Sequence, residues 1–108
     1  MFKITESGRI LLTRGDTAYI NVVVADDAGD YTPQDGDTIV FTVKKSTADA
    51  EVLIQKTVSD GLVKIEPKDT ESLDYGTYVY DCQLTTAAGD VYTFIPPKDF
   101  VVKEEVTY

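Results

Sequence analysis

Apolar and polar residues alternate along several segments of the chain, which is the pattern of half-buried β-strands. In residues 17–25 the alternation places Ile20 and Val22 on the predicted core face. The same two-residue period recurs in residues 39–44 and 78–85, so both segments are predicted to be strands with one face inward. The predicted core includes Ile20, Val22, Ile39, Phe41, Ile65, Tyr78, Tyr80 and Leu84.

Turn-forming residues divide these segments at short intervals, which predicts many short strands in an antiparallel sandwich or barrel. Asp60-Gly61 is the strongest hairpin signal, because glycine adopts a positive φ without steric cost. It is predicted to join residues 51–59 to residues 62–66. Pro96-Pro97 is predicted to be a further turn, and the segment that starts at Phe100 is predicted to continue as a strand to Tyr108.

Residues 67–73 are predicted to form one helical turn, which Asp69 can cap and from which Leu73 can enter the core. The next residues, 74–78, read Asp-Tyr-Gly-Thr-Tyr, and they resemble the tyrosine corner of immunoglobulin-like sandwiches. In immunoglobulin domains a disulfide cysteine lies two residues after that tyrosine, whereas this chain has Tyr80 there. Cys82 is therefore predicted to be a buried, small apolar residue and not a reactive thiol.

Length, composition and charge narrow the possible functions. A chain of 108 residues with 43% hydrophobic residues is long enough for one folded domain, residues 1–108. Its net charge of −9 disfavours binding to nucleic acid or to an anionic membrane. The chain has no histidine, and no serine lies in a nucleophile motif, so no enzyme activity, catalytic residue or cofactor-binding residue is predicted. The first residues lack the pattern of a signal peptide, so we expect synthesis in a cytoplasm without secretion by that route.

Residues 26–37 contain five aspartates and no basic residue. Clustered carboxylates supply the hard oxygen ligands that Ca²⁺ requires, although the spacing matches no EF-hand loop and a solvated loop explains it equally well. A calcium- or carbohydrate-dependent surface-binding module that uses this loop and Tyr31 is the alternative functional prediction. The candidate calcium ligands are Asp26, Asp27, Asp30, Asp35 and Asp37.

Four tyrosines in or beside turns, or at the terminus, are candidates for a surface that contacts a partner protein. They are Tyr31, Tyr75, Tyr92 and Tyr108. Covering the sandwich edge is the alternative role for Tyr75 and Tyr92. A last strand so near the terminus suits pairing with a neighbouring subunit, which makes a second copy of the chain a candidate partner. The charged residues Lys103, Glu104 and Glu105 could equally prevent pairing at that edge.

Several motifs, taken in order, resemble those of a known family. They are Leu-Thr-Arg-Gly-Asp-Thr at residues 12–17, Ile-Glu-Pro-Lys-Asp-Thr at 65–70, and Tyr-Val-Tyr-Asp-Cys-Gln-Leu at 78–84. With the segments between them, they look like the immunoglobulin-like N-terminal module of phage baseplate upper proteins and like small prophage structural proteins of similar length. The resemblance covers about residues 10–102 and implies a virion protein that docks one structural protein to another without catalysis.

These observations combine into one expectation of fold and function. The fold class is an all-β, immunoglobulin-like antiparallel β-sandwich of seven or eight strands, with a short helical turn near residues 68–73. The resemblance implies a structural protein of a phage or prophage tail, baseplate or connector, whose partners are other virion proteins.

Overall fold

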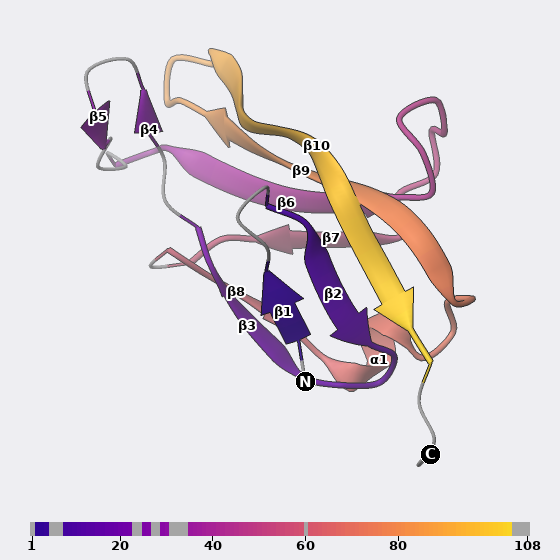
Figure 1. Ribbon diagram of the computed structural model, residues 1–108. Helices are drawn as coiled ribbons and strands as arrows, with labels where there is room; N and C mark the ends of the chain where they lie inside the picture. The colour runs from indigo at the N-terminus through magenta and orange to yellow at the C-terminus, as the bar shows by residue number, and fades with distance from the viewer. Residues whose placement is uncertain are drawn as a thin grey trace.

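The computed structural model describes residues 2–4, 8–22, 25–26, 29–30, 35–59 and 61–104. A six-stranded sheet packs against a two-stranded sheet, with a small additional ladder beside them (Figure 1). The large sheet has the order β1 (Phe2–Ile4), β2 (Ile10–Thr13), β10 (Val91–Lys103), β9 (Gly76–Thr85), β6 (Thr38–Lys44) and β7 (Ile54–Thr57). The facing sheet pairs β3 (Ala18–Asn21) with β8 (Leu62–Ile65), and the small ladder pairs β4 (Ala25–Asp26) with β5 (Gly29–Asp30).

The eight predicted core residues are all buried, so the alternation assigned the inward faces correctly. Phe41 of β6 lies at the centre of the core, where its ring centroid is 5.3 Å from that of Tyr80 and 6.3 Å from that of Phe100. Burying a large apolar side chain of this kind contributes about 1.5–3 kcal/mol. These three rings come from adjacent strands of the large sheet, β10, β9 and β6, and their burial stabilises the fold.

The strand order is that of an immunoglobulin-like sandwich. In the large sheet β10, β9, β6 and β7 take the positions of strands G, F, C and C′, and β3 and β8 take those of B and E. The all-β sandwich is thus confirmed, although the described residues form ten strands where seven or eight were expected. There is also one departure from an antiparallel arrangement. Strand β2 runs parallel to β10, with Ile10 opposite Phe100, which is possible because these strands come from distant parts of the chain and need no hairpin between them.

The two-residue turn expected around Gly61 forms, with a positive φ of 73° at Gly61, but the longer ladder predicted between residues 51–59 and 62–66 is wrong. Strand β7 pairs with β6, and β8 pairs with β3, so the two segments belong to different sheets. Of the predicted ladder, the structure retains the bridge between Ser59 and Leu62. Each segment instead pairs with a strand that brings its inward apolar residues to the core, where Ile54 and Ile65 are both buried.

The turn predicted at Pro96-Pro97 is also wrong, because both prolines lie inside β10. Ile95 is opposite Cys82 and Lys98 is opposite Tyr80, so the two prolines face a single residue of β9. Such a bulge tolerates proline, because its extra residue donates no N–H to the ladder. The last strand ends at Lys103, and residues 105–108 of its predicted extent lie outside the described residues.

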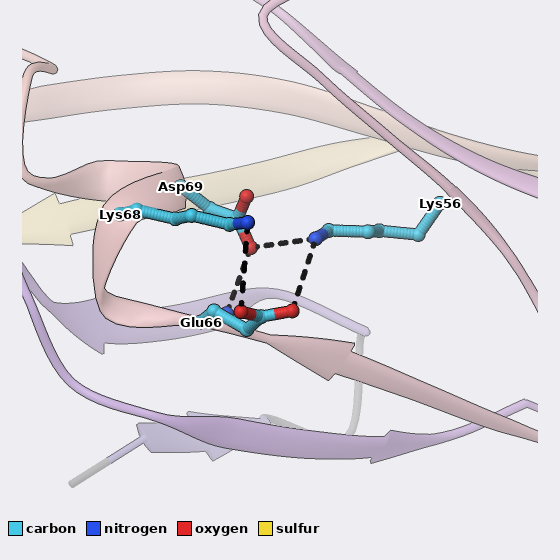
Figure 2. Close-up of polar contacts among 4 residues, drawn as sticks. All are labelled: Lys56, Glu66, Lys68 and Asp69. Carbon is cyan, nitrogen blue, oxygen red and sulfur yellow. Dashed lines mark hydrogen bonds and ion pairs between the residues drawn. The ribbon is translucent and has the colours of Figure 1, made fainter.

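The predicted helical turn is α1 (Pro67–Thr70). Asp69 stabilises its start as part of a capping box, in which its Oδ2 accepts a 2.7 Å hydrogen bond from the backbone N–H of Glu66. Lys56 of β7 reaches the same carboxylate oxygen at 2.9 Å and a Glu66 oxygen at 3.9 Å (Figure 2). This Lys56–Asp69 contact connects the edge strand of the large sheet to the segment that follows β8.

The tyrosine corner is confirmed by the hydroxyl of Tyr78, which donates a 2.7 Å hydrogen bond to the backbone carbonyl of Asp74. Leu73 is half-buried and packs against the core, as expected. Thr70 is fully buried, and its Oγ1 accepts a 2.8 Å hydrogen bond from the backbone N–H of Gly15. These contacts fix the path of the chain between α1 and β9.

We expect Asp69→Ala to lower the free energy of unfolding by about 2 kcal/mol, because it removes both the capping hydrogen bond and the ion pair with Lys56. Urea denaturation measures the loss. Lys68→Met is the control, since the exposed Lys68 lies 3.8 Å from Glu66 and should contribute less than about 0.5 kcal/mol. Equal effects of the two substitutions would contradict this role for Asp69.

Candidate protein-interaction surfaces

The loops gather at two opposite ends of the sandwich. At one end, the turn before β6 lies beside the β9–β10 turn, because a Cβ added to Gly36 would come within 2.7 Å of the Cβ of Ala87. The backbone N–H of Val22 donates to the carbonyl of Gly61 at 2.8 Å, which brings the β7–β8 turn to the same end. Figure 1 shows β4, β5 and the β9–β10 turn together at the upper left. We call this the acidic end.

The other end holds the connections from β2 to β3, from β6 to β7 and from α1 to β9. Arg14 follows β2, and its backbone N–H donates to the carbonyl of Lys103 at the end of β10. Gly76, the first residue of β9, is opposite Val102. These connections lie toward the right of Figure 1, around the β6–β7 loop and α1. We call this the groove end.

Four of the five candidate calcium ligands belong to strands or turns that the structure describes at the acidic end. The described residues include Asp26 on β4, Asp30 on β5, and Asp35 and Asp37 before β6, while Asp27 lies outside them. No group of three His, Cys, Asp or Glu residues in the described part of the chain could hold a metal ion. Calcium binding by this loop stays a prediction.

Two large apolar side chains are exposed at the acidic end, at the start of β10. Val91 and Tyr92 are each 56% exposed. Tyr92 is opposite Leu84, and directly opposite residues of an antiparallel pair point to the same side of the sheet. Tyr92 therefore lies on the core side of the ladder, yet it is exposed where Leu84 is buried. We infer that β9 and β10 extend at this point beyond the facing sheet of β3 and β8, which therefore does not cover Tyr92.

Tyr75, at the groove end, is the second candidate tyrosine that the structure describes. Its side chain is 43% exposed, and the Arg14 guanidinium carbon lies 4.4 Å from the centroid of its ring. Arg14 also donates a 3.3 Å hydrogen bond from Nη1 to the carbonyl of Leu73. Tyr75 and Tyr92 thus lie at opposite ends of β9, while Tyr31 and Tyr108 fall outside the described residues.

An open groove of about 690 Å³ runs beside Tyr75. One wall is the β6–β7 connection, residues 45–53, and the other is the segment 72–78. The sequence patterns did not predict this groove. Strand order could have indicated it, because successive connections alternate between the two ends of a sandwich and therefore bring these two segments to the same end.

Burial raises the pKa of the ionisable side chains along the inward face of β9. It raises the pKa of Tyr80 to about 12, with a smaller effect from Cys82, and the Tyr80 hydroxyl donates to the carbonyl of Gly8. Burial, followed by the charge of Asp81, raises the pKa of Cys82 to about 12. Burial and the charge of Asp74 raise the pKa of Tyr78, whose hydrogen bond to Asp74 partly opposes them. These side chains therefore stay protonated at neutral pH, unlike an activated nucleophile.

We expect stability to fall as the pH rises from 9 to 12. The unfolded chain releases the thiol and phenol protons near their ordinary pKa values of 9.0 and 10.0, whereas the folded chain retains them to about 12. Folding thus binds protons in this window, so alkali favours the unfolded state. Below pH 9 these two groups should contribute no pH dependence.

Thermal unfolding at several pH values measures this effect. Tyr80→Phe should show a shallower fall in Tm above pH 10 than the unmodified chain, whereas Tyr19→Phe, at a 52% exposed position, should leave the slope unchanged. Identical slopes in all three proteins would contradict the burial of the Tyr80 hydroxyl as the cause.

No helix among the described residues is long and apolar enough to cross a membrane. The chain matches no protein-family model, and comparisons with curated proteins and with solved structures also found no match. The resemblance to the phage module therefore rests on the sequence motifs.

Proposed function

We propose that this chain is a structural protein of a phage or prophage virion, which joins other virion proteins by direct contact and catalyses no reaction. The motifs between residues 10 and 102 support the virion role through their resemblance to the baseplate module. Assembly would follow synthesis in a bacterial cytoplasm, and the position in the virion would be in the tail, the baseplate or a connector.

One structural observation carries the assembly role, namely exposed tyrosines at both ends of a continuous strand. Tyr75 immediately precedes β9, and Tyr92 is opposite Leu84 near the far end of that strand. Ten residues of strand at about 3.3 Å each separate the two ends by roughly 30 Å. One small contact cannot include both tyrosines, so the arrangement suits a module that holds two partners apart.

The strand between them is suited to that spacing. β9 is hydrogen-bonded to β10 on one side and to β6 on the other, so it is an interior strand of the large sheet. An interior strand with paired neighbours deforms less readily than a loop. Partners attached at the two ends would therefore stay at a nearly fixed separation.

Charge favours a basic partner at the acidic end. Residues 22–38 and 86–92 contain no lysine or arginine, and the described acidic residues there include Asp35 and also Asp90, which directly precedes the exposed Val91 and Tyr92 in the sequence. Like charges repel, so two copies of the chain would not meet through these ends. A virion protein with a basic patch around an apolar pocket fits this surface better.

Mass spectrometry of purified particles from an induced source strain tests the virion role. We expect the chain to co-purify in a fixed ratio to the tail or baseplate proteins. If it is expressed in the lysate but absent from the particles, the virion role is wrong. The calcium- or carbohydrate-dependent module then becomes the function to test.

A substitution at the acidic end tests the assembly contact separately. We expect Tyr92→Ala in the prophage gene to reduce the amount of the chain in particles severalfold, because it removes an exposed aromatic anchor. Tyr19→Ala is the matched control, since Tyr19 is 52% exposed but lies on β3 of the facing sheet, next to Lys64. Equal incorporation of both variants, each with normal folding, would rule out a contact through Tyr92.

A further inference from the structure

The groove beside Tyr75 has the size of a binding site. Its volume of about 690 Å³ lies within the range of about 300–1,000 Å³ that is usual for ligand-binding clefts. It is partly open to solvent and lies between the β6–β7 connection and the segment that leads into β9. A surface site of this size that is open to solvent can accept part of another protein chain.

Apolar side chains line part of the groove, and neighbouring contacts hold them in place. Leu53 and Leu73 are half-buried, and the part of each side chain that faces away from the groove packs against the core. Arg14 contacts the Tyr75 ring and bonds to the Leu73 carbonyl, which positions the second wall. A site that is already ordered loses less conformational entropy on binding.

Acidic side chains are the main charged groups of the lining. Asp49, Glu51 and Asp74 are exposed there, against one lysine, Lys45. Complementary charge therefore selects a ligand with lysine or arginine side chains. The net charge of −9 on the chain disfavours a second copy as the occupant.

The backbone of the second wall is accessible as well. Residues 74–77 are all exposed, and no heavy atom lies within 4 Å of the position that a Cβ on Gly76 would take. A partner backbone can therefore approach this segment closely, at the point where β9 begins. Extended peptides commonly combine such main-chain contacts with pockets for alternate side chains.

We propose that this groove binds a short extended segment of a partner protein, in which apolar side chains alternate with lysine or arginine. The apolar side chains contact Leu53, Leu73 and Tyr75, and the basic ones pair with the acidic lining. The proposal concerns peptide recognition and holds whether or not the chain is part of a virion.

Nuclear magnetic resonance titration of the ¹⁵N-labelled chain tests it directly. The probe is a capped peptide of alternating lysine and leucine, and the comparison peptide has glutamate in place of each lysine. We expect the lysine peptide to shift the amide signals of Glu51, Leu53 and Gly76 while leaving those of Gly36 and Gly89 at the acidic end unchanged. The glutamate peptide should shift none of them.

Two double variants test which residues contribute to the affinity for the lysine peptide. Glu51→Gln with Tyr75→Ala should weaken binding of the lysine peptide at least tenfold. The matched control, Asp99→Asn with Tyr19→Ala, removes one acid and one exposed tyrosine that do not line the groove and should change the Kd less than twofold. Signal dispersion in the same spectra shows that each variant is folded.

Three results would overturn the proposal. They are no binding of the lysine peptide, equal binding of the glutamate peptide, and an equal loss of affinity in the control variant. Shifts confined to the acidic end would also overturn it, because they would show that charge attraction alone selects the peptide site. None of these results bears on co-purification with particles, so the virion role is judged separately.

Discussion

The inward face of β9 is the constraint on which the rest of the structure depends. Tyr78, Tyr80, Cys82 and Leu84 point into the core from one strand, and that strand is hydrogen-bonded to neighbours on both sides. Its two tyrosines also reach beyond the core with their hydroxyls, which bond to the carbonyls of Asp74 and Gly8. A single run of alternating residues thus fixes the sheet, the core and the paths of two loops.

The hydrogen bonds of the Tyr78 and Tyr80 hydroxyls explain how the buried face of β9 can include polar groups. A phenol hydroxyl buried without a partner would destabilise the fold, whereas a hydroxyl bonded to a backbone carbonyl satisfies both groups. Thr70 does the same for the N–H of Gly15, and no buried side-chain oxygen or nitrogen in the described residues lacks a hydrogen bond. The groove end is therefore held together by polar contacts between segments distant in sequence, with Arg14 completing the set through Leu73 and Tyr75.

Local patterns predicted the faces of the strands well and their partners poorly. The two-residue alternation identified Ile39, Phe41 and Leu84 as core residues, because it records burial at each position regardless of which strand lies alongside. The ladder expected around Gly61 required knowledge of what else could pair with those residues, and β6 and β3 were the better partners. The turn predicted at the two prolines of β10 was wrong for the same reason. A bulge depends on the opposite strand, so the local sequence does not indicate it.

The candidate surfaces show the same limit, because they are made by segments that meet only after the sheets form. Exposure of Tyr75 and Tyr92 was foreseeable from their places beside turns, but their separation to opposite ends of β9 follows from strand order. The groove likewise depends on two connections, residues 45–53 and 72–78, that are separated in the sequence by β7, β8 and α1. The two ends then differ in a way that matters for recognition. Acids and exposed side chains lie at both ends, and at the groove end they line a groove beside Tyr75, whose ring Arg14 contacts. Charge can draw a basic partner toward either end, but only a shaped and supported surface can distinguish one peptide sequence from another.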